Sequence, residues 1–267
     1  MPKQITSPQN SFVKSLIPLR DKSRVRRQSG DFIIEGQREI TIALRHDYKL
    51  KQLLLCTDLL EQTELDEWSK IQAGELIYIN KEVYAKLALR HSTEGVMAVA
   101  SAKSHDLEAL RLTSKAPLLL VAEAPEKPGN IGALLRTADA ANLDGVIIAN
   151  PKTDLYNPNI IRSSVGCLFS NQVATGTTEE VLAYLKANNI RSFAACLEDA
   201  LPYHEQDYSS ASAIVVGTEA DGLSEQWLNE ADARIKIPMQ GSIDSMNVSV
   251  AAGILIFEAK RQRNFSN

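Results

Sequence analysis

The stretch IPMQGSIDSMNVSVAAGILIFE occupies residues 237–258, near the end of the 267-residue sequence. Its first half is polar and irregular, and its second half is an apolar run rich in small residues. Ser245 or Asn247 stands where a helix N-cap is expected, so the residues from Val248 onward predict a helix. Small side chains in this helix allow another backbone to approach closely. We therefore expect a polar loop that can hold a ligand, followed by a closely packed terminal helix.

Upstream of this stretch, the second half of the chain alternates short apolar runs with helical patterns. The run PLLLVAE at 117–123 is apolar throughout, as a strand buried on both faces is. Further strands are predicted at 145–149, 192–196, 213–217 and 234–237, and helices at 131–142 and 179–188. This alternation predicts an α/β fold with a parallel sheet covered on both faces. Ligands of such sheets bind beyond the carboxyl ends of the strands.

The first hundred residues predict a separate, smaller α/β unit. Helices are expected at 11–20, 37–45, 58–72 and 81–89, and strands at 32–34, 51–56, 76–79 and 95–100. The polar stretch 101–116 lacks a strand pattern and predicts a linker or a linking helix. We place the boundary near residue 110, which divides the chain into domains 1–110 and 111–267.

Charge is unevenly distributed between the two halves of the chain. The net charge is −4, but residues 1–115 carry a net +3 and residues 116–267 a net −7. The run KSLIPLRDKSRVRR at 14–27 holds six basic residues against one acidic residue, Asp21. Such a run can neutralise RNA or DNA phosphates. It can equally be the solvated end of a helix, and the run alone does not decide between the two.

Other residue types exclude several classes of protein. The three cysteines, an odd number without close pairing, support neither a disulfide framework nor a thiolate metal site (Cys56, Cys167, Cys196). The histidines lack the spacing of metal ligands, so no metal is expected (His46, His91, His105, His204). No apolar run approaches the roughly 20 residues of a membrane span, and the N-terminus has no signal-peptide pattern. We expect a cytoplasmic protein that does not enter the membrane.

Two loops after buried strands carry polar residues that need an explanation. On a helical wheel over 131–142, Arg136 points away from the apolar side, and Asn130 stands at the expected N-cap. In the loop 217–223, Gly217 and Gly222 suit a tight turn, but no turn requires Glu219. Glu219 could orient a cation such as Arg136 or bind a ribose hydroxyl. A capped helix with a solvated arginine and a surface glutamate is the competing interpretation.

Together these loops and the terminal stretch resemble the SpoU/TrmH family of ribose 2′-O-methyltransferases. The matching motifs are residues 130–133 with 136–138, then 216–219 with 222–223, then 237–239 with 241 and 245–251. FIIEG at 32–36 looks like the opening of the L30e-like domain by which many members recognise RNA. Met246 stands where leucine is usual and Thr218 where asparagine is common. The first change is nearly volume-conserving, and neither should abolish the chemistry.

The resemblance implies a C-terminal α/β trefoil-knot (SPOUT) methyltransferase domain that acts as a homodimer. The knotted loops would bind S-adenosylmethionine, largely through backbone groups, at Gly217, Ile237, Met239, Met246 and Val248. Arg136 would be the catalytic residue, and the substrate, the cofactor and Arg136 would be oriented by Asn130, Glu219, Ser245 and Asn247. The absence of a Gly-rich turn followed by a spaced acidic residue also argues against a Rossmann-type cofactor site.

The resemblance thus implies S-adenosylmethionine-dependent 2′-O-methylation of ribose in RNA, and an N-terminal recognition domain favours 23S ribosomal RNA. The alternatives are a tRNA ribose 2′-O-methyltransferase and a catalytically silent RNA-binding or ribosome-assembly protein. An arginine stays protonated near neutral pH, so we expect Arg136 to stabilise alkoxide charge rather than to act as a base. Arg162 either lines the RNA-facing surface or pairs with a nearby carboxylate.

Overall fold

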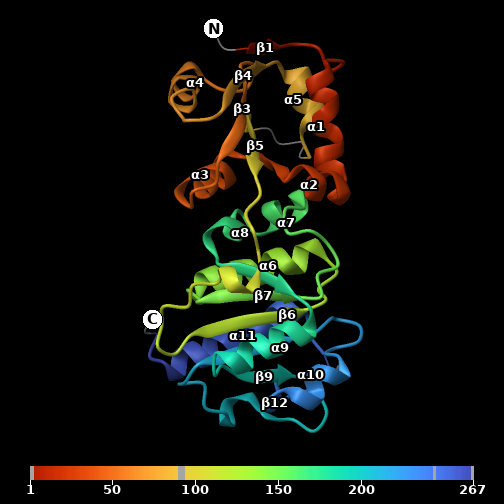
Figure 1. Ribbon diagram of the computed structural model, residues 1–267, viewed down its shortest axis with the longest axis vertical. Helices are drawn as coiled ribbons and strands as arrows, with labels where there is room; N and C mark the ends of the chain where they lie inside the picture. The colour runs from red at the N-terminus through yellow and green to blue at the C-terminus, as the bar shows by residue number, and fades with distance from the viewer. Residues whose placement is uncertain (1–2, 90–93, 243–244, 266–267) are drawn as a thin grey trace. The chain divides into compact units, whose positions relative to one another are not determined.

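The computed structural model describes residues 3–89, 94–242 and 245–265 (Figure 1). The chain forms two compact units, the first from residues 1–103 with 154–170 and the second from 104–153 with 171–267. The expected division at residue 110 therefore differs from the structure in two respects: the first unit ends at residue 103, and segment 154–170 belongs to it. Residues 243 and 244 of the terminal stretch lie outside the described part of the chain.

The first unit is built on a mixed five-stranded sheet with the order β1-β4-β3-β5-β2. Pairs β1–β4 and β3–β4 are parallel, and β3–β5 and β2–β5 are antiparallel. The strands are β1 Lys3–Ile5, β2 Asp31–Glu35, β3 Leu50–Cys56, β4 Glu75–Ile79 and β5 Val96–Ser101. The helices before residue 103 are α1 Ser11–Asp21, α2 Ser23–Ser29, α3 Gln37–Arg45, α4 Gln62–Trp68 and α5 Lys81–Leu87.

Segment 154–170 completes the first unit with two short helices, α7 Pro158–Ser163 and α8 Cys167–Ser170. Tyr156 stacks on Phe32 of β2 at 4.1 Å between ring centroids, and Phe169 meets Tyr48 edge-on at 4.8 Å. At Gly166, with φ +85°, a Cβ would lie only 3.0 Å from Ile42 of α3. The close packing of this segment on α3 and β2 explains why it belongs to the first unit.

A buried ion pair also ties the segment to the first unit. The Arg26 guanidinium donates to both carboxylate oxygens of Asp154, at 2.9 and 2.7 Å, and these side chains are only 5% and 9% exposed. Its remaining Nη1 donates to the carbonyls of Leu19 and Arg20 at the end of α1. Arg26 is therefore a structural residue. The phosphate-binding interpretation of the basic run 14–27 is wrong for this position.

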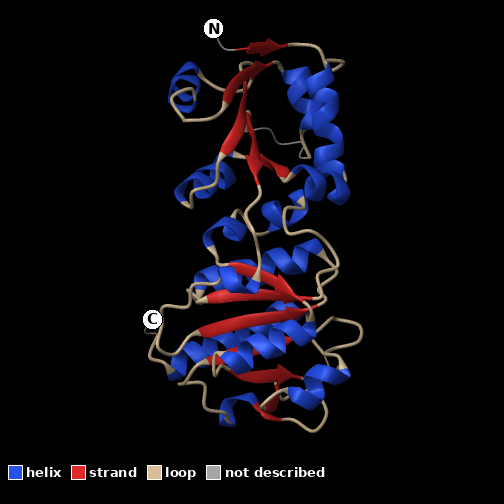
Figure 2. Cartoon of the chain, in the orientation of Figure 1, coloured by secondary structure: helices blue, strands red, loops and turns tan. Residues whose placement is uncertain are grey.

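The second unit holds, within the described residues, an all-parallel seven-stranded sheet with the order β10-β12-β9-β11-β6-β7-β8. The central strands are buried along their whole length, as their apolar runs predicted. The strands are β6 Leu118–Glu123, β7 Gly145–Ala149, β8 Val173–Gly176, β9 Arg191–Ala195, β10 Leu201–Pro202, β11 Ser212–Val216 and β12 Ala233–Lys236 (Figure 2).

Helices cover both faces of this sheet. On one face, α9 Thr178–Ala187 and α10 Glu225–Glu230 pack on alternate strand residues, including Leu119, Ile147 and Val215. On the other face, α6 Pro128–Ala140 packs against α11 Val248–Gln262, which contacts β11. The 3₁₀ helices are η1 Leu107–Ala109 and η2 Tyr203–Glu205. The α/β fold class predicted from the sequence is confirmed.

Two local expectations need correction. The stretch 101–116 contains only the short 3₁₀ helix η1, and it is packed down, because Leu107 and Leu110 are buried in the core of the second unit. The helix expected over 58–72 is shorter, since α4 begins at Gln62 after a capping box between Glu61 and Glu64. Among the described helices, none combines the length and apolar character that a membrane crossing requires.

Candidate active site

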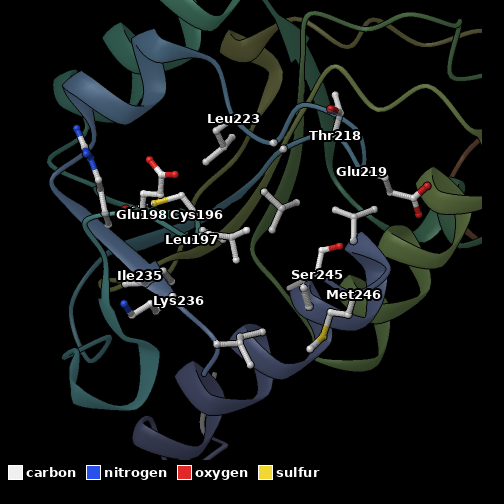
Figure 3. A pocket seen from close by; sticks show the side chains of 18 of the residues that line it. Cys196, Leu197, Glu198, Thr218, Glu219, Leu223, Ile235, Lys236, Ser245 and Met246 are labelled. Atoms are coloured by element: carbon white, nitrogen blue, oxygen red, sulfur yellow. Dashed lines mark hydrogen bonds between the residues drawn. The ribbon is translucent and has the colours of Figure 1, made fainter. Parts of the chain in front are cut away.

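A pocket of about 500 Å³ opens at the carboxyl ends of β9, β11 and β12 (Figure 3). This is where a parallel sheet places its ligand sites, and the volume suits a small-molecule cofactor. Its wall includes all five positions expected to hold a cofactor, namely Gly217, Ile237, Met239, Met246 and Val248. Glu219 and Ser245 also line it. Three loops distant in sequence therefore meet at one cavity.

The loop after β11 requires glycine at its first position. A Cβ on Gly217 would lie 2.1 Å from the carbonyl carbon of Gly222, so no side chain fits there. The loop closes on itself because Thr218 N donates to the Gly222 carbonyl at 2.9 Å, and Gly222 has φ +69°. The tight turn leaves the Gly217 backbone at the pocket wall with no side chain of its own.

Glu123, the last residue of β6, holds the C-terminal end of this loop in place. Its buried carboxylate accepts hydrogen bonds from Ser224 N and Oγ, both at 2.8 Å, and from Thr178 Oγ1 at 2.7 Å. Ser224 is the residue before α10, and its hydroxyl donates to Glu123 and does not cap the helix. One buried carboxylate thus joins β6, α9 and the start of α10.

A polar cluster connects the pocket wall to the start of two helices. Asn247 is the N-cap of α11, and its Oδ1 accepts from Ser249 N at 3.0 Å. Its Nδ2 donates to Glu219 Oε1 at 2.7 Å and to Asn130 Oδ1 at 3.3 Å. Glu219 Oε2 accepts from Lys127 Nζ. We call Lys127, Asn130, Glu219 and Asn247 the carboxylate–amide cluster.

The charges in this cluster reinforce each other. The hydrogen bond from Lys127 is the main reason that the pKa of the Glu219 carboxyl lies below its ordinary value, with hydrogen bonds from Asn130 and Asn247 adding to it. The same contact with Glu219 raises the pKa of Lys127. Glu219 is therefore a carboxylate and Lys127 an ammonium at neutral pH, and both shifts move the pKa values away from neutrality, where acid–base catalysis is most effective.

Arg136 lies on the exposed side of α6, as the helical wheel predicted, and does not line the pocket. It makes no hydrogen bond or ion pair within the part of the chain that the structure describes. The expectation that Glu219 could orient Arg136 is not what this structure shows, because the cation on Glu219 is Lys127. Arg162 of α7 is exposed and belongs to the first unit.

The lining of the pocket fits a cationic ligand with an apolar part. Four carboxylates and two cationic side chains line it (Glu198, Asp199, Glu219, Asp221; Arg234, Lys236), together with apolar residues such as Leu197, Met246 and Leu255. An excess of carboxylates favours a positive charge such as a sulfonium. The glycine at 217 leaves backbone groups accessible, in keeping with binding through the main chain.

The structure brings most of the predicted site residues to the pocket or the carboxylate–amide cluster, but sequence reasoning missed several residues that lie beside them. Asn130 is not the N-cap of α6, because the helix begins at Pro128 and Lys127 is the capping position. Lys127 itself was overlooked, although a lysine directly before a helix start is electrostatically unfavourable and is a usable signal. The pocket residues 195–199, which follow β9, carry no motif and gave no signal.

Comparison with known protein families gives two matches that together span most of the chain. Residues 117–257 match the model described as the SpoU rRNA Methylase family, and residues 10–98 match the MRM3-like substrate binding domain. The first match contains all three motifs quoted from the sequence. The second covers most of the first unit.

Individual proteins align over nearly the whole chain. The 23S rRNA (guanosine(2553)-2′-O)-methyltransferase RlmP of Bacillus subtilis is 29% identical, over 97% of this chain and 99% of that protein. A crystal structure of an RNA 2′-O ribose methyltransferase is 38% identical with a TM-score of 0.84, covering 98% and 99%. The AdoMet-bound rRNA methyltransferase from Sinorhizobium meliloti is 27% identical with a TM-score of 0.89, covering 97% of each chain. The resemblance inferred from the motifs is confirmed.

Proposed function

The chain belongs to the SpoU rRNA methylase family, and we propose that it transfers a methyl group from S-adenosylmethionine to a ribose 2′-hydroxyl of 23S ribosomal RNA. One observation carries the proposal. Glu219 lines the cofactor-sized pocket and also hydrogen-bonds Asn247, so the pocket and the carboxylate–amide cluster share a wall. Relatives of known name act on the same class of RNA, and one is solved with AdoMet bound.

The pocket residues would hold the methyl donor. S-adenosylmethionine supplies, when bound, an electrophilic methyl group on a sulfonium. Backbone groups at Gly217, Ile237 and Met246 would bind its polar parts, with Met239 and Val248 against its apolar surface. The carboxylates at the pocket wall would favour its positive charge. Holding donor and hydroxyl in line would supply much of the rate enhancement.

Arg136 would act on the ribose oxygen. An arginine keeps its proton near neutrality, so its role is to stabilise the negative charge that develops on the oxygen during transfer. Its exposed position on α6, without a carboxylate partner in the described part of the chain, leaves the guanidinium available for RNA. Asn130, Asn247 and Ser245 would orient the substrate beside it.

A second copy of the chain would complete the enzyme. Val250 and Phe257 of α11 are 53% and 42% exposed, and a spacing of seven residues places them on one face of the helix. Exposed apolar residues aligned in this way favour a two-fold helix contact. Sedimentation of the Val250→Glu, Phe257→Glu variant should give monomers where the unmodified chain gives dimers. A monomer for both chains would contradict the dimer.

The first unit would recognise ribosomal RNA, and for this reason we favour ribosomal RNA over tRNA as the substrate. The deciding experiment offers tritiated S-adenosylmethionine and the purified protein with 23S rRNA or bulk tRNA from cells lacking the protein. Label should enter 23S rRNA, and nuclease digestion should recover it as a 2′-O-methylated dinucleotide. Label in tRNA alone would replace the proposal with a tRNA enzyme. No label in either, with no calorimetric binding of S-adenosylmethionine, would indicate a silent RNA-binding protein.

A further inference from the structure

Lys127 is at an unfavourable position for a lysine. It is the N-cap residue of α6, where the helix dipole carries positive charge, and a cation there is disfavoured. Lys127 caps the helix through its main chain alone: its carbonyl accepts hydrogen bonds from Asn130 N at 3.0 Å and Ile131 N at 3.2 Å. Nothing in the construction of α6 therefore requires this side chain.

The contact of Lys127 with Glu219 connects segments that are 92 residues apart in sequence. Lys127 occupies one oxygen of the Glu219 carboxylate, and Asn247 occupies the other. A carboxylate held at both oxygens by donors from two different elements is fixed in its plane and direction. Without Lys127, only the amide donors Asn247 and Asn130 would orient Glu219, and neither carries a charge.

The orientation passes from Glu219 to the amides. Both Nδ2 contacts of Asn247 are to acceptors of the cluster, and its Oδ1 accepts from Ser249 N and from Ser249 Oγ at 2.5 Å. Since Asn130 Oδ1 accepts from Asn247, its Nδ2 is the end that donates, and the hydrogen bond from Asn130 that helps to lower the pKa of Glu219 directs it to that carboxylate. The amide orientations at the start of α6 and α11 thus depend on where Glu219 points.

We propose that Lys127 is a positioning residue of the methyl-transfer site, which holds the Glu219 carboxylate in the direction that fixes the Asn247 and Asn130 amides at the start of α11 and α6. This inference rests on the proposed function. Lys127 does not itself touch the reacting atoms. Because Glu219 keeps it protonated, it takes no proton from the hydroxyl.

The pH dependence follows from the charges around Glu219. Lys127 is the charged side chain that lowers the pKa of Glu219, and the charge of Glu126 raises the pKa of Lys127. Glu219 is ionised above its lowered pKa, and the contact with Asn247 is lost as the pH falls through that value. When Lys127 is removed, the pKa of Glu219 rises toward its ordinary value, so the same loss occurs at a higher pH.

The test compares Lys127→Met and Lys127→Arg with the unmodified chain, and Lys115→Met serves as a control that removes an exposed lysine of the same unit. Lys127→Met should reduce kcat about 10-fold with unchanged KM values, and shift the acidic limb of the kcat–pH profile upward. Lys127→Arg should restore most of the kcat. An unchanged pH profile, or an effect on the KM for RNA alone, would overturn the proposal.

A second readout does not depend on activity. In the free protein, the side-chain NH₂ signals of Asn247 in ¹H–¹⁵N spectra should titrate with Glu219, and at a higher pH in Lys127→Met than in the unmodified chain. Identical titrations would overturn the positioning role even in an active enzyme. An unmodified chain that methylates no RNA would instead contradict the proposed function, while the Asn247 titration would still judge the role of Lys127.

Discussion

The two units each contain a pair of a carboxylate with a cation from a distant part of the sequence, and the two pairs differ in almost every physical respect. Arg26 and Asp154 are buried and bidentate, and the remaining guanidinium donors end on helix carbonyls. Lys127 and Glu219 are 70% and 28% exposed and make a single contact. Burial makes the first pair costly to break. Because the second pair is exposed, it contributes little to the free energy of unfolding. The role proposed for it is therefore to orient the Glu219 carboxylate.

The largest effect is expected from breaking the buried pair. Asp154→Ala leaves Arg26 charged and unpaired in the first unit, which should cost about 3–5 kcal/mol of unfolding free energy. Urea unfolding followed by Trp68, with Trp227 replaced by Phe, reports this unit alone. Glu219→Gln is the matched control, and its Trp68 transition should not move. If Asp154→Ala changed the free energy of unfolding only slightly, the buried pair would contribute as little to stability as the exposed Lys127–Glu219 pair.

Arg136 differs from both cations because it has no carboxylate partner in the described residues. Arg136→Ala should reduce turnover by roughly 10²–10³-fold, the effect of removing one donor at a developing oxyanion. S-adenosylmethionine affinity by calorimetry and both unfolding transitions should stay as they are. Arg136→Lys should recover only part of the rate, since an ammonium lacks the guanidinium fork. Retained turnover in Arg136→Ala would remove Arg136 from the mechanism.

Replacing both members of the buried pair sharpens the comparison further. The double variant Arg26→Met, Asp154→Leu should recover most of the stability lost in Asp154→Ala, because it leaves no buried charge. Recovery should be incomplete, since the Leu19 and Arg20 carbonyls lose their donor. The same urea titration measures it. A double variant as unstable as Asp154→Ala would show that the pair is needed for more than its charge balance.

The smallest effect is expected from cations that are exposed and form no ion pair with the described residues. In the basic run, Arg24 and Arg27 are exposed, whereas Arg20 is bound to Asp21 and to the Lys86 and Leu87 carbonyls at the end of α5. Replacing Arg24 and Arg27 by Ala should lower the slope of log affinity against log salt by about 0.7–0.9 per lost phosphate contact. Filter binding with 23S rRNA fragments measures the slope, and Lys70→Ala is the control. An unchanged slope would leave this surface outside the RNA contact.

Helices and strands with a clear pattern of apolar, buried residues were predicted from the sequence. Those that lack such a pattern, because contacts with distant parts of the chain hold them, were missed. The strand at 145–149 was predicted to the residue, because a run buried on both faces is apolar throughout. Strand β1 has three residues and one buried side chain, so it shows no periodicity. Helix α2 has no side-chain cap and buries only Arg26, which reads as a solvated surface residue.

The site divides in the same way. Gly217, Glu219 and Asn247 stand in motifs, so the resemblance identified them, and all three lie at one place. Lys127 and Asp154 matter only through contacts 92 and 128 residues away, and no local pattern encodes such a distance. The same lysine and aspartate in a different fold would be ordinary surface charges.

The membership of segment 154–170 in the first unit has a consequence for the order of folding during synthesis. Arg26 is synthesised 128 residues before Asp154. At a synthesis rate of roughly 5–20 residues per second, the interval between the two residues is about 6–25 s. During that time the N-terminal sheet lacks the carboxylate for its buried guanidinium and the Tyr156 and Phe169 rings that stack on Phe32. The unit that begins first therefore finishes only after β6, α6 and β7 of its neighbour have been made.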